Sequence, residues 1–127
     1  MRYLLDTDVL LRYVEGDKKL KASIKQVLQD KNTQVFISVI SGIEISIKNR
    51  LGKLSLKTSL NSIFETIEFD LLDINIKHVL EFNKLPMQKE HKDPFDRIII
   101  SQAKAENLTL ITTDKKIWRY KLPLLKA

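Results

Sequence analysis

Residues 93–114 read DPFDRIIISQAKAENLTLITTD, and this stretch contains the clearest helix start of the chain together with the strand that follows the helix. Asp93 stands at the expected N-cap, Pro94 at the first helical position and Asp96 at the third, an order that is typical of helix N-termini. The run TLITT at 109–113 is short and apolar, as expected for a buried strand. The stretch therefore predicts a helix over 93–107 and a strand that ends just before Asp114.

The rest of the chain continues this alternation of helices and strands. Strands are predicted at 2–5, 34–38, 71–74 and 122–125, and helices at 7–14, 18–30, 59–68 and 76–84, with a short element at 117–120. Another helix should begin at Ser38 or Ser41 and end at Gly52, with Ile43, Ile47 and Leu51 facing inward. Apolar strands that alternate with helices indicate an α/β sandwich around a parallel sheet, and 127 residues fit one domain over 1–127.

The composition sets limits on the class of protein. The chain has no Cys, which excludes disulfides and Cys-based zinc sites and favours a reducing cytoplasm. No apolar stretch approaches the ~18 residues of a membrane span, and Asp6 interrupts the N-terminal apolar run, so no signal peptide is expected. The formal net charge of +6 favours polyanionic partners such as RNA or an acidic protein, although ordinary solubility explains it equally well.

Four acidic residues stand where the predicted fold would bring them together. Asp6 and Asp114 directly follow predicted strands, while Glu44 and Asp96 lie early in predicted helices. Because ligand sites of open parallel sheets form at the carboxyl ends of the strands, these carboxylates should share one crevice. Crowded carboxylates repel one another, and a divalent cation relieves that repulsion. Mg²⁺ or Mn²⁺ is the expected ion, because both prefer oxygen ligands and the two His residues do not form a zinc motif.

Each of these acids also has a purely structural interpretation. Asp6 could cap the next helix, Glu44 could be a solvated helix residue, and Asp96 is favourable in a first turn because of the helix dipole. Asp114 could be a turn residue, and Asp93 is explained best as an N-cap.

The segments LLDTDVLL at 4–11, SVISGIEISIKNRLGKL at 38–54 and HKDPFDRIIISQAKAENLTLITTD at 91–114 resemble, in this order, the PIN-domain family and its VapC-type toxin branch. The resemblance implies a PIN-like three-layer sandwich and a metal site made by four acids, which fall on Asp6, Glu44, Asp96 and Asp114. Asp93 is an additional acid that is typical of the DPFD subgroup, and Asp8 and Thr113, which stand next to the matched acids, are further candidate accessory residues. Asp8 is a departure, because relatives more often carry Asn, His or Ser there, and capping is its simpler role.

The resemblance also implies an activity and partners. It implies a metal-dependent endoribonuclease that hydrolyses tRNA or ribosomal RNA to 5′-phosphate and 3′-hydroxyl ends, a VapB-type antitoxin and a homodimer. Two alternatives stay open, a PIN nuclease of RNA processing without a toxin role and an inactive PIN module that only binds RNA or protein. A phospho-receiver domain fits less well, because Asp6 and Asp8 are not adjacent and no matching Lys is found.

Four further side chains near these motifs have two interpretations each. His91 could touch substrate and Arg97 could bind phosphate, but a surface loop and an ion pair are the simpler expectations. Trp118 and Tyr120 could stack on RNA bases, although packing beneath the last strand is more common for such residues. His78, within a predicted helix, is expected to be structural.

Overall fold

The computed structural model describes residues 1–88 and 93–127, and these residues contain the expected alternation of strands and helices. In chain order the elements are β1 (Arg2–Leu5), α1 (Thr7–Val14), α2 (Ala22–Gln29), β2 (Gln34–Ser38), α3 (Val39–Arg50), α4 (Leu60–Thr66), β3 (Asp70–Leu72), α5 (Ile76–Lys84), α6 (Pro94–Glu106), β4 (Thr109–Thr112), the 3₁₀ helix η1 (Ile117–Arg119) and β5 (Leu124–Lys126). His91, the candidate for a substrate contact, lies outside the described residues.

The strands form one parallel sheet in the order β3-β2-β1-β4-β5. The central strand β1 pairs with β2 through Leu4 opposite Phe36, and with β4 through Leu4 opposite Leu110. Short apolar runs suit such strands because both faces of a parallel sheet are covered by helices. The prediction of a parallel sheet is confirmed.

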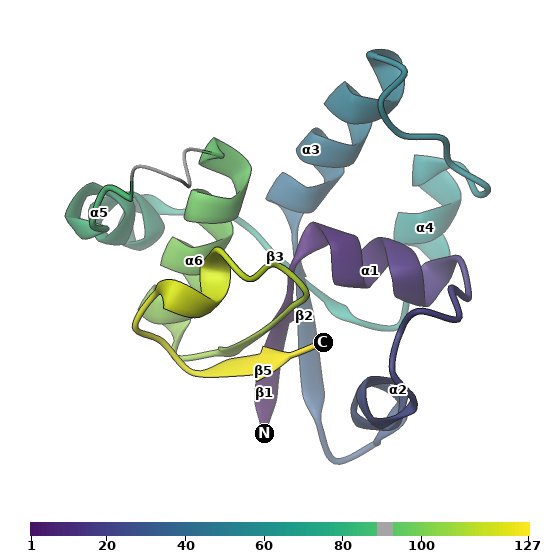
Figure 1. The fold of residues 1–127 in the computed structure, drawn as a ribbon, viewed down its shortest axis with the longest axis horizontal. Helices are drawn as coiled ribbons and strands as arrows, with labels where there is room; N and C mark the ends of the chain where they lie inside the picture. The colour runs from purple at the N-terminus through teal and green to yellow at the C-terminus, as the bar shows by residue number, and fades with distance from the viewer. Residues whose placement is uncertain (89–92) are drawn as a thin grey trace.

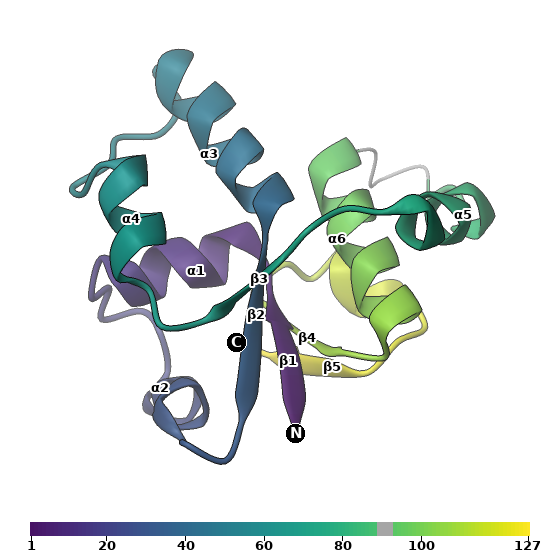
Figure 2. The ribbon, with the colours of Figure 1, turned by 180° about the vertical axis from the view of Figure 1, so that it is seen from behind.

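Helices cover both faces of the sheet (Figures 1 and 2). One face carries α1, α2 and α4, and the other carries α5 and α6. Successive residues of β1 pack into different cores. Leu5 belongs to the core beneath α1 and α2, whereas Leu4 belongs to the core beneath α6. Because side chains of a strand alternate between its faces, one central strand contributes to both cores. The fold is an α/β three-layer sandwich, as expected.

Three helices begin at the carboxyl end of the sheet, and a local side-chain cap defines each start. Asp6 accepts a hydrogen bond from the Val9 N–H, and Ser38 accepts one from the Ile40 N–H. Asp93 accepts from two N–H groups of the first turn of α6, and Pro94 follows it, as predicted. The N-termini of α1 and α3 lie side by side where β1 and β2 end (Figure 1).

The structure corrects the predicted inward face of α3. Ile43, Ile47 and Leu51 are exposed, whereas the buried side chains are those of Ile40, Ser41, Glu44 and Ile45. Apolar residues occur on several sides of this helix, so their spacing did not define one face. The inward face is instead the one that packs toward the sheet and the neighbouring helices.

Several element boundaries also differ from the predictions. The strand predicted at 71–74 is Asp70–Leu72, and the helix predicted at 59–68 is Leu60–Thr66. The second helix begins at Ala22 instead of residue 18, because Asp17 forms a turn by accepting a hydrogen bond from the Lys19 N–H. The last strand begins at Leu124, after Pro123, which has no N–H to donate to a neighbouring strand. None of the helices in the described part of the chain combines the length and apolar character that crossing a membrane would require.

Candidate metal centre

The seven acidic and hydroxyl residues that the sequence analysis singled out all line one cavity of about 380 Å³. They are Asp6, Asp8, Glu44, Asp93, Asp96, Thr113 and Asp114. Asp6 follows β1 and Asp114 follows β4, while Glu44 and Asp96 come from α3 and α6. The cavity therefore lies at the carboxyl end of the sheet, where the sequence placed it.

Asp6 is buried at the bottom of this arrangement and is 4% exposed. Its Oδ1 accepts a hydrogen bond from the Val9 N–H at 2.8 Å, and its Oδ2 accepts one from the Thr112 hydroxyl. Burial raises the pKa of Asp6 to about 7, with the nearby charges of Asp8 and Asp96 adding to the rise. Asp6 thus caps α1, and it also offers a carboxyl group whose ionised form a nearby cation would stabilise.

Glu44, Asp93 and Asp96 form the tightest acidic group of the described residues, and each offers a carboxylate oxygen within 4.8 Å of the others. We call these three residues the acidic trio. Glu44 is 3% exposed, and its Oε1 is buried without a hydrogen-bond partner among the described residues. An unpartnered buried carboxylate oxygen is costly. The trio therefore fits a divalent metal ion, which would satisfy that oxygen and reduce the repulsion.

Asp93 combines capping with membership of the acidic trio. Its Oδ1 accepts from the Phe95 N–H at 2.9 Å and from the Asp96 N–H at 3.3 Å, as an N-cap should. The sequence analysis predicts only an accessory role for Asp93 beside four other acids. In the structure, Asp93 and Asp96 both offer a carboxylate oxygen within 4.8 Å of Glu44, whereas Asp6 and Asp114 line the cavity outside this group.

The remaining predicted residues have partners at the edge of the cavity. Asp8 accepts a hydrogen bond from the Thr113 hydroxyl at 2.8 Å and pairs with Arg12 at 2.9 Å. Asp114 accepts from the Lys116 N–H at 2.9 Å, which makes it a turn residue as well as a cavity residue. These bonds connect the end of β4 to α1 and hold the edge of the cavity in place.

Two lysines of the cavity were missed by the sequence analysis. Lys48 and Lys53 both line it, and the Lys48 Nζ lies 2.6 Å from the Glu44 Oε2. The signal was present in the segment EISIK, because Glu44 and Lys48 are four residues apart, a spacing that brings side chains together on a helix. A charged pair at this spacing is usually an exposed pair, and only the fold shows that this Glu is buried.

The aromatic and basic candidates lie elsewhere. Tyr120 is buried, and Arg97 donates to its hydroxyl and to the carbonyl oxygens of Leu85 and Pro86. The ion pair expected for Arg97 is not among these described contacts. His78 is buried and bonded to Glu106, which confirms its structural role.

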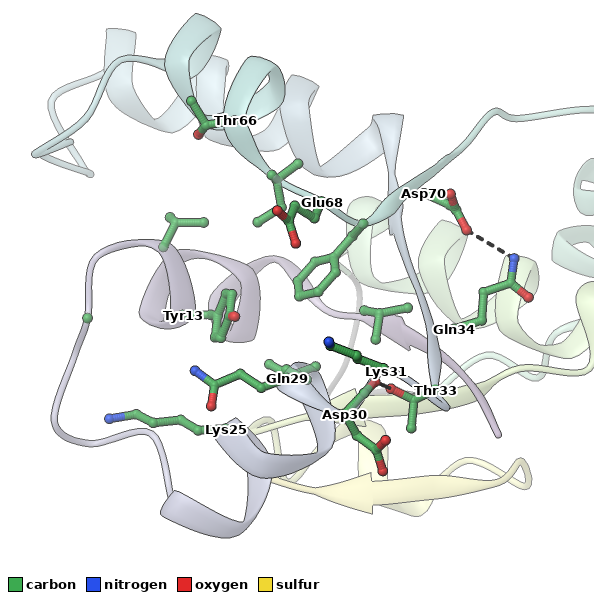
Figure 3. Close-up of a pocket in the computed structure, with 16 residues that line it drawn as sticks. Tyr13, Lys25, Gln29, Asp30, Lys31, Thr33, Gln34, Thr66, Glu68 and Asp70 are labelled. Carbon is green, nitrogen blue, oxygen red and sulfur yellow. Dashed lines mark hydrogen bonds between the residues drawn. The ribbon is translucent and has the colours of Figure 1, made fainter.

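A second, larger cavity of about 830 Å³ lies between α2, the end of α4 and the starts of β2 and β3 (Figure 3). Figure 3 shows Lys25, Gln29 and Asp30 at its edge and the Gln34–Asp70 hydrogen bond beside it. None of the acidic residues that line the 380 Å³ cavity also lines this one. Size alone therefore does not select a candidate site, whereas the crowded carboxylates make the smaller cavity the candidate.

Comparison with known proteins agrees with this geometry. The family model of the PIN domain matches residues 3–122. The chain belongs to the PIN-domain family. PIN domains are generally nucleases, and in this PIN domain the matched region includes every residue of the acidic cavity. No match is found among the curated proteins.

Solved structures share the fold over almost their whole length. VapBC2 from Rickettsia felis, bound to a DNA fragment from their promoter, contains a chain that is 24% identical, with a TM-score of 0.75 and coverage of 99% of this chain and 98% of that one. VapBC-1 from nontypeable Haemophilus influenzae contains a chain that is 23% identical, with a TM-score of 0.69 and coverage of 99% of this chain and 98% of that one. A toxin–antitoxin complex from Klebsiella pneumoniae contains a chain that is 21% identical, with a TM-score of 0.68 and coverage of 98% of this chain and 96% of that one. At these identities the likeness establishes the fold.

Proposed function

We propose that this PIN domain is the toxin of a VapBC-type toxin–antitoxin pair and acts as a divalent-metal-dependent endoribonuclease in the cytoplasm. One observation carries the proposal. The acidic trio lies beside the buried Asp6 in one cavity, and the buried Oε1 of Glu44 has no described hydrogen-bond partner. The carboxylates of such a cavity repel one another without a cation, and their oxygens are the ligands that a divalent cation prefers.

The proposed ligands of Mg²⁺ or Mn²⁺ are Asp6, Glu44, Asp96 and Asp114, with Asp93 as a further carboxylate of the trio. When bound, such an ion polarises phosphoryl oxygens and lowers the pKa of a bound water. The chain itself holds the acids in place. Thr112 fixes Asp6 by donating its hydroxyl hydrogen, and the α6 cap fixes Asp93. Carboxylates that are held before the ion arrives need little rearrangement to bind it.

RNA is the proposed substrate, with tRNA or ribosomal RNA as the class that the resemblance implies. The net charge of +6 favours the approach of a polyanion. Lys48 and Lys53 line the cavity and can offset the charge of a phosphodiester that enters among the carboxylates. The proposed products carry 5′-phosphate and 3′-hydroxyl ends.

A VapB-type antitoxin is the proposed protein partner, and a homodimer is the proposed assembly. Three solved structures with this fold are named as VapBC or toxin–antitoxin complexes, and one of these three includes promoter DNA. A basic side chain of the antitoxin would be attracted to the acidic cavity. Whether a small antitoxin gene adjoins this gene separates the toxin from a PIN nuclease of RNA processing.

The direct test is cleavage of total RNA by the purified protein, with sequencing of the new 5′ ends. We expect cleavage with Mg²⁺ or Mn²⁺, complete loss in EDTA and recovery when the ion is restored, because crowded carboxylates require the cation. Glu44→Gln, which keeps the size of the side chain, should be folded and inactive. Undiminished cleavage in excess EDTA would refute the metal mechanism, and folded protein that binds RNA without cutting it would support the binding-module alternative.

A further inference from the structure

Lys48 has an unusual place among the basic residues of this chain. It lies near the end of α3, and its Nζ contacts the Glu44 Oε2 at 2.6 Å. The lysine side chain is 42% exposed, whereas the glutamate side chain is 4% exposed. The pair therefore joins a buried carboxylate of the acidic trio to a cation that reaches it from solvent.

The charge of Lys48 acts on the whole trio. The pKa of Lys48 is raised, first by its hydrogen bond to Glu44 and further by the charges of Asp93 and Asp96. Lys48 also lines the cavity that holds all three acids. Its ammonium group thus supplies positive charge at the place where the proposed metal would supply it.

The backbone fixes the start of this lysine side chain close to the acids, and the side chain itself is partly exposed. The helix ends at Arg50, and Gly52, which follows the C-cap residue Leu51, has a φ of +74°. The Lys53 N–H then donates to the Lys48 carbonyl oxygen at 2.9 Å. This ending is a glycine C-cap, which anchors the last turn through the backbone. The Lys48 side chain keeps several rotatable bonds and an exposed path away from the cavity.

We propose that Lys48 is an internal counter-ion of the acidic trio, which neutralises Glu44 in the metal-free protein and is displaced when the divalent ion binds. The inference rests on the proposed metal site. Only one oxygen of Glu44 is paired with Lys48, and the other has no described partner, so the ammonium group compensates the trio incompletely. A divalent ion carries twice the charge and can contact several carboxylates at once, so it should replace the lysine.

If the metal displaces Lys48, the lysine competes with the metal for Glu44. Removal of the lysine charge should therefore raise the metal affinity instead of lowering it. Lys48→Met keeps the length of the side chain and removes its charge. The variant should bind Mn²⁺ about threefold to tenfold more tightly, since the competing ion pair is lost. Its metal-free protein should melt at a lower temperature, because the trio has lost its counter-ion. Saturating Mn²⁺ should erase or reverse that difference in melting temperature.

Titration calorimetry with Mn²⁺ and thermal unfolding, both without RNA, test the proposal on the full chain. Lys48→Arg should behave like the wild type because it keeps the charge. Lys18→Met, at an exposed residue that does not line the cavity, should leave the metal affinity nearly unchanged. Tighter binding confined to Lys48→Met supports the exchange. Equal or weaker binding by Lys48→Met overturns it while the metal site stands, whereas absence of Mn²⁺ binding by the wild type overturns the proposed function together with the inference.

Discussion

Single residues of the site combine structural and chemical roles. Asp6 caps α1 through the Val9 N–H while its buried carboxyl faces the cavity, and Asp93 caps α6 while it belongs to the acidic trio. In both cases one local hydrogen bond fixes the rotamer that the site needs. The structural and functional interpretations of these acids are therefore compatible, and substitutions must be chosen to separate them.

The raised pKa of Asp6 predicts a pH-dependent stability of the metal-free protein. Its pKa is about 7 in the folded chain against 3.8 in a model peptide, so the folded state binds the extra proton between these values. The free energy of unfolding should therefore fall as the pH rises from about 4 to 7, and level off above that. Urea unfolding in EDTA measures this slope.

Two comparisons control the pH experiment. Asp6→Asn should remove the slope, whereas Glu65→Gln, on the exposed side of α4, should retain it. Saturating Mg²⁺ should flatten the profile near neutral pH, because a cation at the carboxylate lowers its pKa. A slope that persists in Asp6→Asn would show that another group is responsible.

Asp93 and Asp96 can be separated because only Asp93 is the helix cap. Asp93→Asn keeps a capping oxygen and should keep the melting temperature, whereas Asp93→Ala should lose about 1 kcal/mol of stability. Asp96→Asn should remain folded but lose cleavage activity by orders of magnitude, because it removes a proposed metal ligand. Cleavage rates and melting temperatures of the three variants give the answer. Normal cleavage by Asp96→Asn, with a folded but inactive Asp93→Asn, would reverse the assignment.

At the scale of elements, buried polar contacts hold α3 and α6 in the position that the site requires. The Ser38 hydroxyl, at the start of α3, donates to the Gln102 Oε1 of α6 at 2.5 Å, and both side chains are fully buried. Between the N-termini of α1 and α3, the hydroxyls of Thr7 and Ser41 are 2.9 Å apart. These contacts position the helices that carry Glu44 and Asp96.

The contact between Ser38 and Gln102 predicts a large effect from a residue outside the cavity. Gln102→Ala leaves buried polar groups unpaired and a small void, which should cost roughly 2–3 kcal/mol. Metal affinity should also fall, because α3 and α6 would no longer be held together. Urea unfolding and Mn²⁺ calorimetry measure both quantities. Gln26→Ala, on the exposed side of α2, is the matched control and should change neither; a stable Gln102→Ala with unaltered affinity would contradict this role.

At the scale of the whole molecule, α3 and α5 expose apolar side chains that a monomer does not need. Ile47 is exposed on α3, and Val79 and Leu80 are exposed on α5. A shallow apolar groove of about 450 Å³ follows α3 and α4 and includes Ile47. Exposed apolar surface of this kind often marks a protein interface.

We therefore expect a dimer at micromolar concentration, measured by light scattering as twice the 14.8 kDa mass of the chain. The double variant Ile47→Glu and Leu80→Glu should be monomeric, because charges in an apolar interface oppose association. Gln26→Glu should remain dimeric. A wild-type protein that stays monomeric across the micromolar range would refute the expected assembly.

The sequence alone determined the features that depend on neighbouring residues. The cap at Asp93, the proline after it and the apolar run at 109–112 specify their helix and strand locally, since each involves residues only a few positions apart. The positions of Asp6 and Asp114 after strands indicated the end of the sheet at which the site lies, because parallel strands share that end.

The tertiary structure alone decided which side chains meet there. The sequence pattern predicted that Ile43 and Ile47 face inward, but the packing of α3 buries Glu44 instead. Apolar residues occur on several sides of this helix, so the neighbouring elements determine which side is buried. For the same reason Lys48 could be noticed only after Glu44 was known to be buried. Capping is a local interaction, whereas the burial of a charge and the choice of its counter-ion depend on elements that are distant in the chain.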